Sequence, residues 1–369
     1  MTKASATPTA TRGRVVVAMS GGVDSSVSAA LLHKAGCEVI GITLELYGAP
    51  LKAGARTCCA GTDRHDARRV AEQLGIPHYV FDLSDRFRET VIDNFADSYL
   101  RGETPVPCVQ CNAGVKFSDL LDYARDLDAS ALATGHYVRR IAGAAGAELH
   151  CPADGARDQT WFMFATTREQ LEFLRFPVGD LRKDEVRRLA RDLGLSVADK
   201  ADSQDICFVG GDGYASLVER LRPGACAAGE IVDVSGRVLG RHDGVIHYTV
   251  GQRRGLGLSG GPYYVVRLDA ARARVVVGSR EDLRVRRVSL RGVNWLGERF
   301  WGDGAVSGRD LRVRFRSSME PVGGCLSYGG GGGGALEFTE PVYGVSAGQA
   351  AVFYEGTRML GGGWISDIS

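Results

Sequence analysis

One glycine-rich segment of this sequence has the composition of a phosphate-binding loop. The residues Ser20-Gly21-Gly22-Val23-Asp24-Ser25-Ser26 follow an apolar run at 14–19 and precede a stretch with helical character at 25–35. Glycines let the backbone approach an anion closely, and the amides at a helix N-terminus favour negative charge. The segment lacks the lysine of a Walker loop, so it predicts another kind of phosphate site. The alternative is an ordinary strand–helix turn capped by Asp or Ser.

Two cysteines have surroundings that suit sulfur chemistry. Cys111 lies in the proline-rich segment PVPCVQCN, which we expect to be a loop just before a helix at 113–126. The helix dipole and Lys116 would lower the pKa of its thiol. Cys207 lies in the segment DICFV, where burial in a strand is the common alternative. A persulfide on one cysteine can donate sulfur, and a second cysteine can then resolve the intermediate as a disulfide.

Cys108 and Cys111 also form a CxxC pair, which leaves other interpretations open. The pair could be a thioredoxin-like couple, or half of a zinc site completed by Cys58 and Cys59. It could also supply two ligands of an iron–sulfur cluster, with Cys207 as the third.

The elements that must position these residues change in character along the chain. Apolar runs at 14–19, 38–44, 78–82 and 131–134 alternate with helical stretches at 25–35, 63–74, 86–100 and 113–126, which predicts an α/β domain with a parallel sheet. After about residue 215, short apolar alternations between glycine-rich turns predict strands, including one at 246–252. We therefore expect a catalytic domain at 1–215, a small β-rich domain at 216–283 and a β-barrel at 284–369. The run Gly329–Gly334 should form a hairpin tip.

Composition narrows the class of protein. The chain has 369 residues, 44% hydrophobic and 24% charged, and it lacks an apolar run of the roughly 18 residues that a membrane span needs. Its nine cysteines form no disulfide-scaffold spacing, which favours a reducing, cytoplasmic compartment. Residues 1–13 should be a frayed terminus, with a transit peptide as the alternative. Net charge is only +1, but nine arginines lie between Arg284 and Arg316, and more lie at 182–191. Such clusters could bind phosphates or could simply be solvated.

Several longer motifs now point to a known family. The chain resembles the tRNA-specific 2-thiouridylases, within the N-type ATP pyrophosphatases, through these segments in order: SGGVDSSVSA, TPVPCVQCNAGVKF, ATGHYVRR, RDQTWFM, FPVGDLRKDEVRRLA, DSQDICFVG, HYTVGQRRGLGL and GGGWI. The resemblance implies an adenine-nucleotide α-hydrolase-like (PP-loop) domain, followed by a small β domain and a β-barrel. It also implies ATP and Mg²⁺, a tRNA substrate, and a sulfur-relay protein or cysteine desulfurase as persulfide donor.

The resemblance implies the following reaction and residues. ATP adenylates O2 of the wobble uridine (U34) in tRNAs for Lys, Glu and Gln, and sulfur from a persulfide then displaces AMP. The matching catalytic residues are Cys111, the nucleophile, and Cys207, the persulfide carrier. The matching ATP-binding positions are Ala18, Met19, Ser20, Gly21, Gly22, Val23, Asp24, Ser25, Leu44 and Gly135. The matching tRNA-binding positions are Val106, Pro107 and Cys108, which hold the target base, and His136, Arg157, Asp158, Gln159, Arg314, Phe315 and Gln349.

Three alternatives remain. The same reaction could use an iron–sulfur cluster, or the loop could serve another pyrophosphate-forming enzyme such as a ligase or amidotransferase. The chain could also be an RNA-binding module without catalysis.

Overall fold

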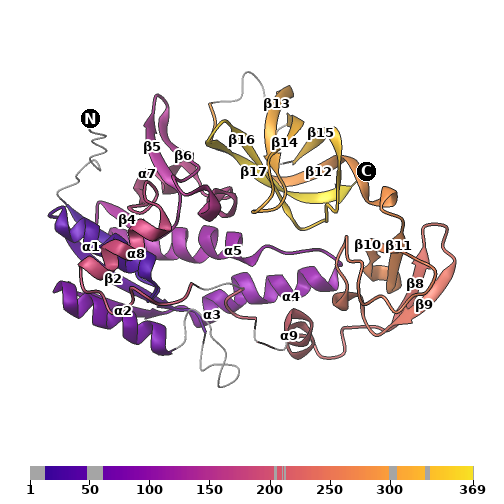
Figure 1. The fold of residues 1–369 in the computed structure, drawn as a ribbon, viewed down its shortest axis with the longest axis horizontal. Coiled ribbons are helices and arrows are strands. Elements are labelled where there is room, and N and C mark those ends of the chain that lie inside the picture. Colours follow the sequence, from indigo (N-terminus) through magenta and orange to yellow (C-terminus); the bar gives the residue numbers. More distant parts are fainter. Residues whose placement is uncertain are drawn as a thin grey trace. The chain divides into compact units, whose positions relative to one another are not determined.

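The computed structural model describes residues 13–47, 61–202, 206–209, 211, 213–298, 306–328 and 333–368. The chain divides into two compact units, one of residues 1–88 and 111–208 and the other of residues 89–110 and 209–369, and each is described by itself. Figure 1 marks their helices and strands. The expectations for residues 1–12, for Cys58 and Cys59, and for Gly329 to Gly332 fall outside the described residues.

The first unit is built on a five-stranded sheet in the order β3-β2-β1-β4-β7, in which all neighbours are parallel. The α/β expectation is therefore confirmed. The carboxyl ends of the strands meet at one edge, where such sheets bind ligands. The strands are β1 (Arg14–Ala18), β2 (Glu38–Glu45), β3 (His78–Asp82), β4 (Ala131–Thr134) and β7 (Leu174–Arg175), and a hairpin of β5 (Arg139–Gly143) and β6 (Gly146–His150) belongs to the same unit.

Helices bury the central strand of this sheet. Val15, Val16 and Val17 of β1 are fully buried, as expected when both faces are covered. Val15 and Val17 share one core with α1, α2 and α8. The helices of the unit are α1 (Val23–Lys34), α2 (Gly61–Leu74), α3 (Ser84–Phe87), the π-helix η2 (Cys111–Asp119), α6 (Leu120–Asp126), the 3₁₀ turns η3 (Gly155–Arg157) and η4 (Thr160–Met163), α7 (Arg168–Phe173) and α8 (Lys183–Asp192).

The segment around Cys111 corrects one expectation. A helix begins at Pro107, not after the cysteines: α5 (Pro107–Gln110) continues directly into η2. Proline suits the first position of a helix because its missing N–H would have no partner there. Cys111 therefore lies one turn inside a helix, at the start of its π-helical part. The expected helix at 86–100 likewise contains a π-helical turn, η1 (Arg88–Ile92), between α3 and α4 (Asp93–Leu100).

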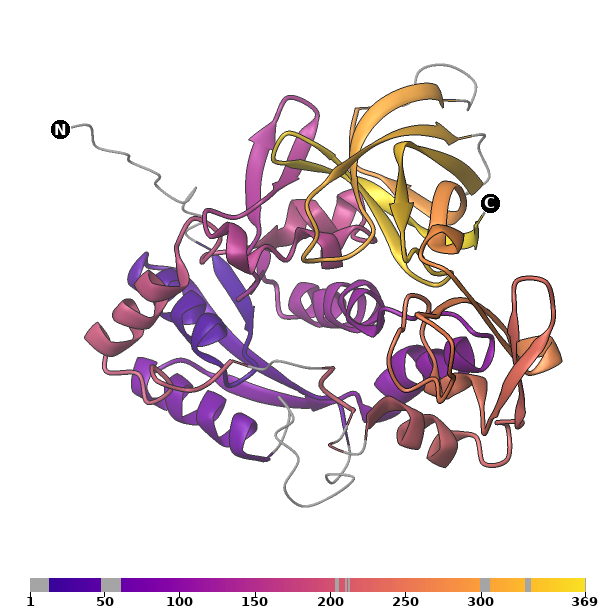
Figure 2. The same ribbon diagram turned by 45° about the vertical axis from the view of Figure 1, so that its right-hand side comes forward.

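The second unit contains a closed barrel of six antiparallel strands. The pairing runs β12-β15-β14-β13-β16-β17 and back to β12, so the expected C-terminal barrel is confirmed (Figure 2). Its core includes Val288, Val313, Leu336, Phe353 and Ile365. The strands are β12 (Arg284–Trp295), β13 (Val306–Arg314), β14 (Val322–Tyr328), β15 (Gly333–Tyr343), β16 (Ala350–Glu355) and β17 (Arg358–Ile368).

A smaller sheet, in the order β10-β11-β8-β9, precedes the barrel. Its elements are α9 (Gly213–Leu221), β8 (Gly229–Asp233), β9 (Val238–His242), η5 (Val245–His247), β10 (Tyr264–Asp269), η6 (Ala270–Arg272), β11 (Arg274–Gly278) and η7 (Glu281–Leu283). The strand expected at 246–252 is wrong. Adjacent residues Val245 and Ile246 are both buried in a 3₁₀ turn, and Gly251 has a left-handed φ of +89°, so this segment turns instead of extending. The helix α9 was not predicted.

Candidate active site

The first unit contains a cavity of about 380 Å³ at the carboxyl edge of its sheet. Residues from the ends of β1, β2 and β4 line it, together with the first turn of α1. Of the expected ATP-binding positions, all but Gly21 line this cavity: Ala18, Met19, Ser20, Gly22, Val23, Asp24, Ser25, Leu44 and Gly135. A parallel sheet brings these positions together because its strands all end at the same edge.

The loop after β1 is held in a tight conformation. Gly21 has a φ of +73°, and a Cβ atom there would lie 2.1 Å from the carbonyl oxygen of Asp63. The Ser20 N–H donates to Ser25 Oγ at 3.2 Å, which closes the loop over the start of α1. Gly135 at the end of β4 touches the same turn, since a Cβ there would lie 2.5 Å from the Ser25 nitrogen. Backbone groups can therefore approach a phosphate closely here.

Asp24 is the centre of a charged network in this cavity. Lys183 Nζ donates to both Asp24 carboxylate oxygens at 2.8 Å, and the Tyr137 hydroxyl donates to Asp24 Oδ1 at 2.8 Å. Lys183 Nζ also lies 2.8 Å from Asp202 Oδ1, and Arg157 Nη1 lies 3.0 Å from Asp202 Oδ2. Burial raises the pKa of Asp202, but the hydrogen bond and charge of Lys183 outweigh this and hold it below its usual value.

A second lysine that lines the cavity, Lys200, also holds the loop in place. Lys200 Nζ donates to the Gly21 carbonyl oxygen at 3.0 Å and to Asp66 Oδ2 at 2.6 Å, and it also donates to Asp63. Burial lowers the pKa of Lys200, but these carboxylates outweigh it and raise the pKa overall. Neither Lys200 nor Lys183 was among the site residues expected from the sequence. Lys183 belongs to the family-like motif FPVGDLRKDEVRRLA, and this motif was the signal that could have identified it.

The two cysteines expected to carry the chemistry line this same cavity. Cys111 is 6% exposed, and Lys116 of the same π-helix also lines the cavity and supplies positive charge. Cys207 lies in a turn and not in a strand, and the Tyr47 hydroxyl donates a hydrogen bond to its sulfur. The arrangement places two thiols beside a candidate phosphate-binding loop.

Three of the four expected tRNA-contact residues of this unit also line the cavity: His136, Arg157 and Gln159. Burial, and then the charge of Lys116, lower the pKa of His136 to about 3, so its imidazole is neutral near pH 7. Gln159 Oε1 accepts from the Tyr137 N–H at 2.8 Å. Asp158 does not line the cavity and instead accepts from the N–H and hydroxyl of Thr160, which is a local turn contact.

The remaining expected tRNA contacts belong to the second unit. Pro107 is buried and Cys108 is exposed in α5, and Val106 precedes them.

Phe315 is 5% exposed and packs in the barrel core, so its side chain does not reach the surface. The Arg314 guanidinium lies 4.9 Å from the centre of the Tyr354 ring. Gln349 Oε1 accepts from the Ser346 N–H at 3.0 Å in a local turn.

Two further properties concern metals and membranes. Within the described ranges, no three His, Cys, Asp or Glu side chains converge in a way that could hold a metal ion. Among the helices of those ranges, none has both the length and the apolar character of a membrane-crossing segment.

Family models match three consecutive parts of the chain. A model described as tRNA methyl transferase HUP domain matches residues 13–211, and one described as tRNA methyl transferase PRC-barrel domain matches residues 218–279. A model described as Aminomethyltransferase beta-barrel domain matches residues 285–365. A solved 4-thiouridine synthetase–RNA complex with bound ATP aligns with 58% of this chain and 51% of its own, at 15% identity and a TM-score of 0.34, a likeness too low to bear on function.

Full-length relatives are much more similar. A Rhodospirillum centenum protein named tRNA-specific 2-thiouridylase MnmA is 58% identical over 362 residues, which cover 95% of this chain and 91% of the relative. A protein of the same name from Rhodopseudomonas palustris (strain HaA2) is 59% identical over 366 residues, which cover 96% and 91%. With this identity over nearly its whole length, the chain belongs to the tRNA-specific 2-thiouridylase family.

Proposed function

We propose that this protein catalyses the ATP-dependent 2-thiolation of the wobble uridine (U34) in tRNAs for Lys, Glu and Gln. The observation that carries this proposal is the single cavity lined by the phosphate-type loop, Cys111 and Cys207. Nucleotide activation and sulfur delivery both need access to one pyrimidine, and a shared cavity supplies it. The names of the relatives support tRNA as the substrate and 2-thiouridine as the product.

The reaction divides into two transfers. The uracil O2 attacks the α-phosphorus of ATP, and pyrophosphate leaves. The terminal sulfur of a Cys207 persulfide then attacks C2, and AMP leaves, so that the base is joined to Cys207 through a disulfide bond. The Cys111 thiolate attacks the Cys207 sulfur and releases the base as the thione, which leaves a Cys111–Cys207 disulfide for an external thiol to reduce. The transferred sulfur gains the two electrons that the cysteines lose.

The residues of the cavity have proposed roles in these transfers. The loop from Ser20 to Ser25 would hold the phosphates, and Lys183 would balance their charge. Mg²⁺ bound with ATP would fit the Asp24 carboxylate, because Mg²⁺ is usually held by one or two carboxylates together with substrate phosphates. Such an ion would neutralise phosphate charge. The neutral imidazole of His136 would accept or donate hydrogen bonds without adding charge.

The remaining parts of the proposal concern partners and organisation. We propose 1–215 as the catalytic domain, 216–283 as a small β domain and 284–369 as the tRNA-binding barrel. The persulfide would come from a sulfur-relay protein or cysteine desulfurase, in the cytoplasm. Arg314 and Gln349 remain proposed tRNA contacts, and Phe315 could take part only through its backbone because its side chain is buried.

Mass spectrometry of tRNA nucleosides tests the proposal directly. After incubation with ATP, Mg²⁺ and a persulfide donor, the wild-type protein should form 2-thiouridine. Cys111→Ser and Cys207→Ser should each lower the yield by at least about a hundredfold, because each removes a reacting sulfur. Cys325→Ser, in the barrel strand β14, is the matched control and should keep full activity.

Three results would count against this route. Release of AMP and pyrophosphate by the wild type and by both cysteine variants, without any 2-thiouridine, would favour a ligase or amidotransferase reaction. A methylated uridine in place of 2-thiouridine, formed when S-adenosylmethionine is added as a methyl donor, would favour the reaction that two of the family-model descriptions name. A brown chromophore after anaerobic purification, lost in Cys108→Ser, would favour an iron–sulfur cluster over the persulfide.

A further inference from the structure

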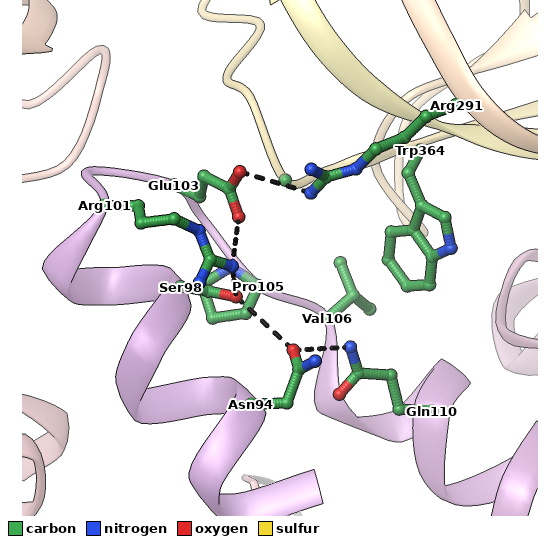
Figure 3. Close-up of a pocket in the computed structure, with 10 residues that line it drawn as sticks. Asn94, Ser98, Arg101, Glu103, Pro105, Val106, Gln110, Arg291 and Trp364 are labelled. Atoms are coloured by element: carbon green, nitrogen blue, oxygen red, sulfur yellow. Dashed lines mark hydrogen bonds and ion pairs between the residues drawn. The ribbon is translucent and has the colours of Figure 1, made fainter. Parts of the chain in front are cut away.

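A second cavity, of about 280 Å³, lies in the second unit and has no role in the chemistry described above. Its walls come from α4, from the segment that leads into α5, and from the barrel strands β12 and β17 (Figure 3). One wall is Trp364, the aromatic residue of the closing motif GGGWI, which the proposed mechanism does not use.

The barrel fixes an aromatic ring and a positive charge side by side. Trp364 of β17 pairs directly with Arg291 of β12, so both side chains leave the same face of the antiparallel pair. The Gly348 N–H donates to the Ile365 carbonyl at 2.8 Å, and the Ile365 N–H donates to the Gln349 carbonyl at 2.8 Å, which anchors the strand beside Trp364. The ring is partly exposed toward the cavity.

The charges around the cavity favour an anion. Glu103 is 13% exposed and is shared by two arginines: Arg291 Nη2 lies 3.2 Å from Oε1, and Arg101 Nη2 lies 3.0 Å from Oε2. One carboxylate therefore holds two guanidinium groups, which are each 52% exposed. The lining keeps one net positive charge, and Figure 3 shows both arginines directed toward Glu103. Guanidinium groups in this setting bind phosphate well.

The side-chain amides of Asn94 and Gln110 also line the cavity. Gln110 Nε2 donates to Asn94 Oδ1 at 2.8 Å (Figure 3). Gln110 Oε1 is buried, and no hydrogen-bond partner for it exists among the described residues. Buried acceptors are normally satisfied, so a rotation of the Gln110 amide that brings Oε1 to the cavity and to a donor on a bound molecule would be favourable. Paired amides that can both donate and accept suit the hydrogen-bonding edge of a base.

We propose that this cavity binds the base of an unpaired nucleotide that flanks the target uridine, with the base stacked on Trp364 and its phosphate near Arg291. The inference rests on the proposed function, because Val106 lines the cavity and belongs to the segment expected to hold the target base. A flanking nucleotide is covalently tied to the target and must lie close to that segment. The volume is below the roughly 300–1,000 Å³ of pockets for whole drug-sized ligands, so it suits a single base.

The test measures binding of an anticodon stem-loop RNA to the full-length protein by fluorescence anisotropy at one fixed salt concentration. The RNA keeps the target uridine, and each flanking nucleotide is replaced in turn by an abasic residue. One replacement should weaken wild-type binding about five- to a hundredfold, the range for loss of one stacked base. Trp364→Ala should weaken binding of the intact RNA by a similar factor, and the two changes together should cost no more than either alone.

Matched variants separate stacking from folding. Trp364→Phe keeps a stacking ring and should recover most of the affinity. Tyr343→Ala removes another partly exposed aromatic residue of the barrel that does not line the cavity, and it should bind like wild type. Arg291→Ala should reduce the salt dependence of binding, whereas Trp364→Ala should leave that dependence unchanged.

The inference is overturned if both abasic RNAs bind wild type as tightly as the intact RNA does. It is also overturned if Trp364→Ala weakens the intact and abasic RNAs equally, since that result indicates a structural role. Formation of 2-thiouridine by the wild-type protein is measured in parallel. If the protein forms 2-thiouridine but RNA binding does not respond to these changes, only this inference is wrong. If the protein forms no 2-thiouridine, the proposed function itself is wrong.

Discussion

The Asp24 carboxylate receives two donors, the Lys183 ammonium and the Tyr137 hydroxyl, and each lies 2.8 Å away. Lys183 is 10% exposed and also holds Asp202, which is 16% exposed. One mostly buried ammonium is therefore shared by two carboxylates beside the phosphate loop. Removing it would leave both carboxylates partly desolvated and without their closest cation.

Lys183→Met should lower the free energy of unfolding by about 2 kcal/mol and weaken ATP binding. Because Lys183 holds the pKa of Asp202 below its usual value of 3.8, the stabilisation is present above that pH and is lost as the pH falls through the folded pKa. The difference between variant and wild type should therefore shrink below about pH 4. Urea unfolding between pH 7 and pH 3 measures it. Arg188→Ala, an exposed change on the same helix, is the control. A difference independent of pH would contradict the electrostatic explanation.

At the scale of elements, the phosphate loop depends on the close approach of β4 to α1. Gly135 makes this contact. A Cβ atom at position 135 would clash with the backbone of Ser25 in α1. The helix N-terminus can only present its amides to the cavity if the end of β4 leaves room beside it. The sequence shows a glycine at this position, but the contact joins strands and helices more than a hundred residues apart.

Gly135→Ala should displace the first turn of α1, because the added methyl would lie 2.5 Å from the Ser25 nitrogen. We expect a loss of about 1–3 kcal/mol in stability, typical of overpacking, and at least a tenfold loss in ATP affinity. Thermal unfolding with and without ATP measures both. Gly155→Ala, where an added Cβ meets nothing within 4 Å, should be neutral. Equal effects of the two substitutions would refute the steric argument.

At the scale of the whole molecule, the net charge of +1 conceals a local basic surface. Arg284, Arg286, Arg287 and Arg291 are all exposed on the single strand β12, while Val285, Val288 and Leu290 of that strand face the barrel core. The strand alternates on each side of an irregularity between Val285 and Arg287, and this irregularity keeps the arginines exposed on both sides of it. These exposed arginines can bind the phosphates of an RNA even though the chain as a whole is nearly neutral.

Binding of full-length tRNA should therefore weaken steeply as salt rises. Arg286→Ala should lower the affinity and reduce the slope of log K against log salt by about one, because one phosphate contact is lost. Arg68→Ala, an exposed arginine of α2 paired with Glu72, should leave the slope unchanged. A salt-independent affinity for the wild-type protein would remove the proposed role of β12.

The sequence by itself was enough to predict those elements of the fold that are encoded by patterns within a few neighbouring residues. Apolar runs located β1 to β4, the glycine-rich loop located the start of α1, and spacing after residue 284 predicted the barrel. The longer motifs indicated the family. Two predictions from local patterns were wrong. Residues 246–252 alternate as a strand does, but the chain turns there with Gly251 in a left-handed conformation. Pro107 starts a helix where a loop was expected.

Only the tertiary structure decided which distant side chains meet. Lys183 and Lys200 lie more than 150 residues from the loop that they support, and their pairing with Asp24 and Gly21 leaves no local pattern. Cys111 and Cys207 likewise enter one cavity only because separate segments of the first unit fold around the same sheet edge. Periodicity and turn chemistry act over a few residues, whereas a site is assembled by packing between segments that are far apart along the chain.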